Sequence, residues 1–235
     1  MVQNDLTIYS EYAHEWWTPG APRFRSLQNL TPFRLGLIRE FVGELSGKSV
    51  LDLGCGGGLI AVPLLDQGAH VVGIDQSAGS IEAACVAAKG KGEFRVGDVC
   101  SLDFPDNSFD CVLLADVLDH IPQFAKALRE AARVLRPGGS LFVGTINRTF
   151  IAWFLTLFLG ESLGFIPKGT HAYSLFIRPD ELIETAQLYG LKCKKVQGEW
   201  PRFAATLARG AITLAKSESL AVAYSAVFEK LGDAK

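Results

Sequence analysis

One segment constrains the fold of this chain more than any other: the glycine-rich VLDLGCGGG at residues 50–58. Its first half is apolar apart from Asp52 and predicts a buried strand, and the apolar spacing of residues 59–67 predicts a helix that ends at Gly68. Glycines in the turn permit positive φ angles and bring the backbone close to a ligand, while the helix begins with free N–H groups. This order predicts an α/β domain with a ligand at the glycine turn.

Strand-like and helix-like segments alternate up to residue 145, which is typical of α/β proteins with a mainly parallel sheet. The predicted strands cover residues 49–53, 70–74, 94–96, 109–115, 140–145, 191–200 and 220–229, and the predicted helices cover residues 35–45, 59–67, 77–89, 124–135 and 180–189. Residues 201–216 carry no assignment. We therefore expect a seven-stranded, mostly parallel sheet with an antiparallel last strand and helices on both faces.

Composition excludes several classes of protein. The 235 residues carry 23 basic and 25 acidic side chains, a formal net charge of −2. This balance argues against binding of nucleic acid, which requires a basic face. The five cysteines are scattered without a CxxC pair, so we expect neither disulfides nor a thiolate zinc site, and we expect a reducing, cytoplasmic location. The N-terminal segment lacks the pattern of a secretory signal.

The mean hydropathy of +0.21 has its main source in residues 150–158, FIAWFLTLF. A bilayer requires about 20 apolar residues, so we expect no membrane-spanning helix, while a peripheral membrane contact stays open. This stretch lies within residues 147–178, which interrupt the alternation. We expect an apolar insert that acts as a substrate lid, with ordinary core packing as the alternative. The whole chain, residues 1–235, is predicted to be a single domain, in which residues 1–46 form an N-terminal helical cap.

The acid at the end of the first predicted strand bears on the ligand. The dinucleotide fingerprint G-x-G-x-x-G/A fails when it starts at Gly54 and is satisfied when it starts at Gly56, so glycine spacing alone does not decide. Asp52 would repel a pyrophosphate but suits the amino group of the methionine moiety of S-adenosylmethionine. A strand-end carboxylate that accepts a backbone N–H is the alternative. We therefore expect Asp52, Gly54 and Gly56 to line a pocket for S-adenosylmethionine.

Two more acids follow predicted strands. Asp75 ends the second strand, where a carboxylate can accept both ribose hydroxyls, a contact that enzymes using NAD and S-adenosylmethionine share. Its alternative role is to cap the next helix, for which Ser77 competes. Asp98 follows the third strand and can accept from an adenine amino group, while the N–H of Val99 donates to the ring. A loop aspartate that caps a turn is the alternative for Asp98.

Three ionisable groups crowd the end of the fourth predicted strand: Asp116, Asp119 and His120. In open α/β sheets, ligands bind outside the carboxyl ends of the strands. Two carboxylates and an imidazole can hold a hard divalent cation such as Mg²⁺, or a histidine base oriented by an aspartate. A solvated turn with a capping aspartate is the alternative. We expect Asp119 and His120 to be catalytic and all three residues to be metal ligands.

The ordered motifs over residues 50–145 resemble those of class I S-adenosylmethionine-dependent methyltransferases. They are the glycine turn, the ribose acid, the adenine acid, the F-x-x-x-x-F-D segment at residues 104–110 and LRPGG at residues 135–139. The flanks resemble the ubiquinone-biosynthesis O-methyltransferase family. They comprise Trp16-Trp17, LTPFRLGLI at 30–38, TINR at 145–148, PKGTH at 167–171 and FIRP at 176–179. We expect Trp16 and Trp17 to form an arm that packs on the core rather than on substrate.

The resemblance implies roles for further residues. Arg34 would contact the cofactor carboxylate, and Ala115 would lie under the adenosine. The acceptor would be a catechol or polyprenylated phenol, an apolar small molecule; an N- or C-methyltransferase of the same fold is the alternative. The family's metal cluster is Glu-x-x-Glu-His, which is Asp-Val-Leu-Asp-His here, so each carboxylate is one methylene shorter. Thr18 and Gln28 stand where the family has Asp and His.

Overall fold

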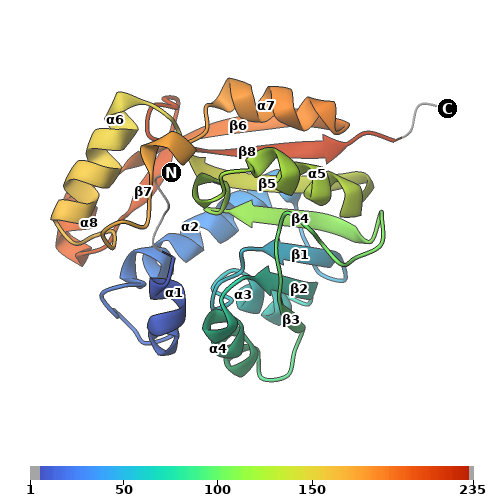
Figure 1. Ribbon diagram of the computed structural model, residues 1–235, viewed down its shortest axis with the longest axis horizontal. Coiled ribbons are helices and arrows are strands. Elements are labelled where there is room, and N and C mark those ends of the chain that lie inside the picture. Colours follow the sequence, from blue (N-terminus) through green and yellow to red (C-terminus); the bar gives the residue numbers. More distant parts are fainter. Residues whose placement is uncertain (1–5, 233–235) are drawn as a thin grey trace.

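An eight-stranded sheet crosses the molecule in the order β3-β2-β1-β4-β5-β8-β6-β7, in a computed structural model that describes residues 6–232 (Figure 1). The strands β1 to β5 pair in parallel, and β8, β6 and β7 pair antiparallel with their neighbours. The strands are β1 (Ser49–Leu53), β2 (His70–Asp75), β3 (Glu93–Val96), β4 (Phe109–Ala115), β5 (Leu135–Ile146), β6 (Leu191–Pro201), β7 (Leu214–Ser217) and β8 (Ala223–Lys230).

Helices cover both faces of the sheet, because the central strands are apolar on both sides. Val50 and Leu113 pack with α2 and α3, whereas Leu51 and Leu114 belong to the core that includes α5 and α7. The helices are α1 (Ile8–Glu11), α2 (Arg25–Val42), α3 (Ala61–Asp66), α4 (Ala78–Ala88), α5 (Phe124–Val134), α6 (Phe150–Trp153), α7 (Pro179–Leu188) and α8 (Phe203–Arg209). A π-helical segment, Phe154–Gly160, continues α6, and short 3₁₀ turns lie at Ala13–Glu15, Leu118–His120 and Tyr173–Leu175.

The predicted fold class is confirmed, with corrections in the C-terminal part. The sheet has eight strands rather than seven, since β7 (Leu214–Ser217) forms at the end of the unassigned residues 201–216. This four-residue edge strand pairs with β6 and has no apolar run that would have predicted it. The last strand, β8, is antiparallel as expected: it inserts between β5 and β6 and pairs antiparallel with both, so β6 runs in the same direction as β1 to β5.

The N-terminal helix was also predicted too short. It begins at Arg25 rather than at residue 35, and it continues through Pro32. Proline usually marks a helix boundary, yet Pro32 lies inside α2. The buried face of α2, which includes Arg34, Leu37 and Ile38, instead fixes the helix by tertiary packing.

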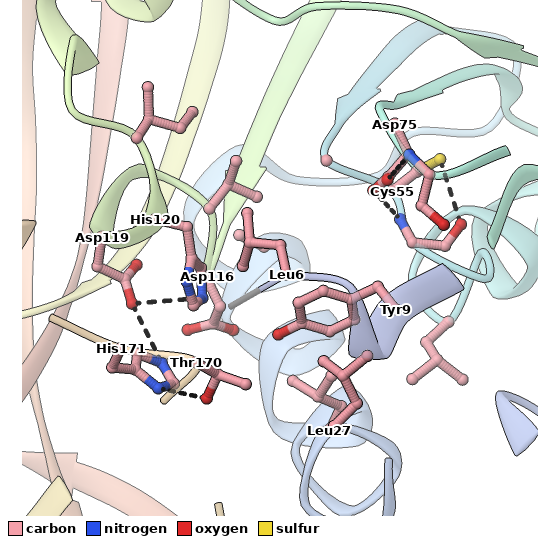
Figure 2. Close-up of a pocket in the computed structure, with 18 of the residues that line it drawn as sticks. Leu6, Tyr9, Leu27, Cys55, Asp75, Asp116, Asp119, His120, Thr170 and His171 are labelled. Atoms are coloured by element: carbon pink, nitrogen blue, oxygen red, sulfur yellow. Dashed lines mark hydrogen bonds and ion pairs between the residues drawn. The ribbon is translucent and has the colours of Figure 1, made fainter. Parts of the chain in front are cut away.

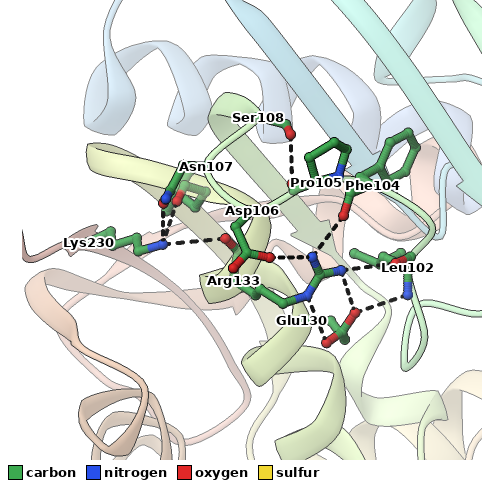
Figure 3. Close-up of polar contacts among 10 residues, drawn as sticks. Leu102, Phe104, Pro105, Asp106, Asn107, Ser108, Glu130, Arg133 and Lys230 are labelled. Carbon is green, nitrogen blue, oxygen red and sulfur yellow. Dashed lines mark hydrogen bonds and ion pairs between the residues drawn. The ribbon is translucent and has the colours of Figure 1, made fainter.

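Arg133 of α5 fastens the loop that leads into β4 (Figure 3). Its guanidinium donates to the backbone oxygens of Leu102 and Phe104 at 2.9 and 2.7 Å, and it pairs with Glu130 and Asp106 at 2.8 Å each. The F-x-x-x-x-F-D segment therefore has a structural role, because it receives these bonds and aligns β4 beside β1.

Replacing Arg133 with Met is expected to lower the free energy of unfolding by about 2 kcal/mol, since two backbone carbonyls and a carboxylate lose a charged donor. Urea denaturation measures the change. Arg136→Met is the matched control: its side chain is 44% exposed and pairs with Asp110, so its loss should cost less than about 1 kcal/mol. Equal losses for the two variants would contradict this role of Arg133.

Candidate active site

A large cavity of about 1120 Å³ opens at the carboxyl ends of β1, β2 and β4. Strand order changes direction between β1 and β4, the place where open α/β sheets bind ligands. The glycine turn and the strand-end acids line one part of the cavity. The segment 6–10, helix α2 and part of residues 147–178 line the rest. The cavity thus joins the predicted cofactor pocket to the predicted acceptor site.

The glycine turn is held in a conformation that requires glycine. Gly54 and Gly56 have φ angles of +71° and +51°. A Cβ atom at Gly54 would lie 2.5 Å from a methyl group of Val117, and one at Gly56 would lie 2.6 Å from the ring of Trp16. Both positions therefore exclude larger residues, which keeps the backbone open to the cavity.

Asp75 holds the same turn from β2. Its two carboxylate oxygens accept hydrogen bonds from the backbone N–H groups of Gly56 and Ser77, at 2.9 and 2.8 Å (Figure 2). Each oxygen keeps a further lone pair, so both can also accept a ribose hydroxyl. Ser77 is the N-cap of α4, because its hydroxyl accepts from the backbone N–H of Ser80. Ser77, rather than Asp75, therefore caps this helix.

Asp52 is a buried carboxyl with only 3% exposure at the cavity wall. Burial, and then the negative charge of Asp75, raise the pKa of Asp52 to about 7, against a hydrogen bond from the backbone of Ala61. A cation is therefore the ligand that this position is suited to bind.

Three further predicted cofactor residues line the cavity, and one of them, Asp98, has a local hydrogen-bond partner. Asp98 is exposed, and its Oδ1 accepts from the backbone N–H of Cys100 at 2.8 Å, the turn-capping bond considered as its alternative. Val99 and Ala115 also line the cavity. A contact between Asp98 and an adenine amino group stays a prediction.

The aromatic arm closes the cavity beside the glycine turn. Trp16 is 5% exposed, donates from Nε1 to Ser80 Oγ at 3.0 Å and stacks on Phe24 with ring centroids 4.1 Å apart. Trp17 donates to the backbone oxygen of Gly57 at 2.8 Å. Trp16 is thus packed on the core as expected, whereas Trp17 is 42% exposed. Gln28 stands at the position where the family resemblance implies a histidine. Its Nε2 donates to the backbone oxygens of residues 16 and 18, both at 2.9 Å, and these bonds fix the arm.

Arg34 lies at the cavity wall, but its charge is already paired. Its Nε and Nη2 donate to the two oxygens of Asp116 at 2.8 and 2.6 Å, and Nη1 donates to Glu199 at 2.5 Å. Two nearby carboxylates raise the pKa of this buried guanidinium further above its usual range. A contact between Arg34 and a cofactor carboxylate stays a prediction.

The predicted metal cluster is only partly assembled. Asp119 and His120 lie together at the end of β4, but Asp116 turns toward Arg34, with a positive φ angle of 58°. His171 from the apolar insert takes its place: donor atoms of Asp119, His120 and His171 all lie within 4.8 Å of one another. His171 was missed as a site residue, although it belongs to the PKGTH motif that the family resemblance uses.

The three side chains share a buried, polar corner of the cavity (Figure 2). Asp119 Oδ2 lies 3.6 Å from His171 Nε2 and 3.9 Å from His120 Nε2, and its Oδ1 accepts from Thr145 Oγ1 at 3.1 Å. Burial is the main reason that the pKa of Asp119 is raised. Burial also lowers the pKa of His171, and the charge of His120 lowers it further.

This donor set does not fit Mg²⁺. Magnesium prefers six oxygen ligands in octahedral geometry, whereas the corner offers one carboxylate and two imidazoles. The second carboxylate that the sequence predicted is committed to a buried arginine. The expectation of a magnesium site at Asp116, Asp119 and His120 is therefore not supported by the structure.

Comparison with known proteins agrees with the fold and the site. Residues 51–143 match the methyltransferase domain family. The chain shares its fold with the crystal structure of magnesium protoporphyrin IX methyltransferase from Synechocystis PCC 6803 with bound SAH. The two superpose with a TM-score of 0.66 at 17% identity, over 95% of this chain and 96% of that one. The fold and the strand-end motifs define a class I methyltransferase that uses S-adenosylmethionine.

Relatives of higher sequence identity assign the chain to one family within this class. The chain is 35% identical to the ubiquinone biosynthesis O-methyltransferase of Leptothrix cholodnii, over 83% of this chain and 85% of the relative. It is 37% identical to the protein of that name from Rhizobium etli, over 81% and 82%. The chain belongs to the ubiquinone biosynthesis O-methyltransferase family. Among residues 6–232, the helices are all too short or too polar to cross a membrane.

Proposed function

We propose that this methyltransferase transfers the methyl group of S-adenosylmethionine to a hydroxyl oxygen of an apolar catechol or polyprenylated phenol in ubiquinone biosynthesis. The observation that carries the proposal is the shared cavity. It connects the glycine turn to the corner formed by Asp119, His120 and His171, with apolar walls from Leu27, Leu30 and the insert. A methyl donor and a phenol can therefore meet in one cavity.

The residues of the cavity define how the reaction would proceed. Asp52 faces the ammonium group of the donor, Asp75 the ribose, and Asp98 with Val99 the adenine. The acceptor oxygen attacks the sulfonium methyl in line; the new C–O bond forms as the S–CH₃ bond breaks, and a neutral thioether leaves. The phenol proton passes to the Asp119 corner. Positioning and proton removal supply most of the rate enhancement in such a transfer.

An acceptor screen tests the proposed function. Purified protein is incubated with S-adenosylmethionine and a series of catechols and phenols with and without an isoprenoid tail, and methylated products are identified by mass spectrometry. We expect O-methylation, with kcat/KM rising with tail length. Methylation of amine or carbon acceptors only would contradict the proposal.

The donor should bind more tightly as pH rises. Below its pKa of about 7, Asp52 must release a proton before it can pair with an ammonium group, so affinity grows as this carboxyl ionises. We expect Kd to fall about tenfold from about pH 6 to about pH 8. Calorimetry in buffers of different ionisation enthalpy measures both affinity and proton release. Asp52→Asn should flatten this dependence; a steep dependence in that variant would contradict the role of Asp52.

Residues 147–178 are proposed to form a lid that also touches a membrane or the acceptor's tail. Ile166 and Phe165 line the cavity, whereas Phe150 and Phe158 on the same insert are 72% and 53% exposed. An apolar surface on a segment that also walls the active site suits an acceptor that resides in lipid.

Replacing Phe150 and Phe158 with Ser is expected to raise KM for a long-tailed acceptor about tenfold. KM for a truncated acceptor should stay within about twofold, because only the tail reaches this surface. Co-sedimentation with phospholipid vesicles should weaken in parallel. Leu188→Ser is the matched control, a 79% exposed apolar residue on α7. Equal changes for both acceptors would point to ordinary packing of the insert.

A further inference from the structure

We propose that Asp119, His120 and His171 form a site for a divalent transition-metal ion of borderline softness, with Zn²⁺ as its representative, and that His171 replaces Asp116 as the third ligand. The inference deepens the proposed function, because it concerns the corner of the cavity where the acceptor hydroxyl is activated. It differs from the magnesium site that the sequence motif predicts.

The spacing of the donor atoms supports such a site. A four-coordinate zinc ion with bonds of about 2.0–2.1 Å places its ligand atoms about 3.3 Å apart. Asp119 Oδ2 lies 3.6 Å from His171 Nε2 and 3.9 Å from His120 Nε2. The donor atoms of His120 and His171 lie within 4.8 Å of each other, so the two imidazoles would move toward the ion as it binds. The separations exceed those of direct hydrogen bonds.

A hydrogen-bond relay orients His171 as a ligand. The hydroxyl of Thr170 donates its single proton to the backbone oxygen of Pro167 at 2.9 Å. Its contact with His171 Nδ1 at 3.0 Å must therefore be one in which Nδ1–H donates. That tautomer leaves a lone pair on Nε2, the atom directed at Asp119. A histidine whose second nitrogen donates to a fixed oxygen is the usual arrangement around protein-bound metals.

Asp119 is held in the same manner. Thr145 of β5 donates to Oδ1 at 3.1 Å, which leaves Oδ2 for the ion. The carboxylate is 1% exposed, so it is positioned by packing as well as by this bond. The three ligands come from a strand end and a distant insert, and all three line the cavity. Three protein ligands with further positions open to a substrate are typical of catalytic zinc sites.

The chemistry of the donors selects the metal. Two imidazoles and one carboxylate suit Zn²⁺, Fe²⁺ or Co²⁺, whereas Mg²⁺ requires oxygen ligands. Asp116 cannot easily join the site, because removing it would leave the buried Arg34 without one of its two partners.

Metal binding is tested directly on the full chain after treatment with a chelator and dialysis. Calorimetric titration should show one Zn²⁺ per chain, bound at least about a hundredfold more tightly than Mg²⁺. Co²⁺ should give visible absorption bands that Zn²⁺ abolishes. His171→Gln should weaken Zn²⁺ binding at least about tenfold, and Asp116→Asn should leave it within about twofold. His70→Gln, an exposed histidine on β2, is the matched control.

Several results would overturn the inference. These are equal or tighter binding of Mg²⁺, an unchanged Zn²⁺ affinity in His171→Gln, or loss of binding in Asp116→Asn but not in His171→Gln. Cofactor affinity and the melting temperature of each variant exclude misfolding. The proposed function is judged separately in the acceptor screen. Full methylation by metal-free protein that binds no Zn²⁺ overturns the metal site alone. Tight Zn²⁺ binding without methylation of any phenol overturns the proposed function alone.

Discussion

Turnover is expected to fall by about 10²- to 10⁴-fold when Asp119 is replaced by Asn, while the affinity for S-adenosylmethionine stays within about twofold. The carboxylate is buried, touches two histidines and is fixed by Thr145. Asn has the same shape and keeps one oxygen for Thr145, but it has no charge. Whether Asp119 orients a base or binds a cation, the negative charge is the property that the reaction uses.

Single-turnover kinetics with a saturating catechol acceptor measures the loss, and calorimetry measures cofactor binding. Asp103→Asn is the matched control, since Asp103 is exposed and lies outside the cavity. A variant at position 119 that keeps most of its turnover would show that the acceptor is activated elsewhere. A variant that loses cofactor binding would instead show that the corner supports the glycine turn.

The cofactor part of the cavity was predictable because its residues are local. Each acid lies at or just after the carboxyl end of its strand, and parallel strands bring these ends to one edge. Asp52, Asp75 and Asp98 therefore lie at one cavity without any long-range inference. The strands themselves were predictable for the same reason: the runs in β1, β2 and β4 are apolar, and turns of glycine or polar residues separate them.

The acceptor part was not predictable in the same way, because contacts between distant segments decide it. Asp116, Asp119 and His120 are neighbours in the sequence. Asp116 nevertheless pairs with Arg34, which lies 82 residues away in the sequence, and so does not join the other two. Glu199 then completes that pair from β6, and no motif marks it. His171 belonged to a quoted motif, but nothing in its local pattern shows which cavity it faces. Such choices depend on which charge is buried with which partner.

Asp75→Ala is expected to weaken binding of S-adenosylhomocysteine by about 10²-fold or more, because two ribose hydroxyls lose a charged acceptor at about 1.5–3 kcal/mol each. The variant also removes the bonds from Asp75 to the N–H groups of Gly56 and Ser77, so affinity alone does not separate ribose recognition from loss of the turn. Asp98→Ala, an exposed acid of the same cavity, should cost about tenfold at most.

A double-mutant cycle separates the two effects. The 2′,3′-dideoxy analogue of S-adenosylhomocysteine lacks the hydroxyls, so wild-type protein should bind it about 10²-fold more weakly than the parent compound. In Asp75→Ala the two ligands should bind with nearly equal affinity, since the group that distinguishes them is gone. If the variant still prefers the parent compound as strongly as wild type does, Asp75 serves the glycine turn alone, and the ribose is recognised by other residues of the cavity.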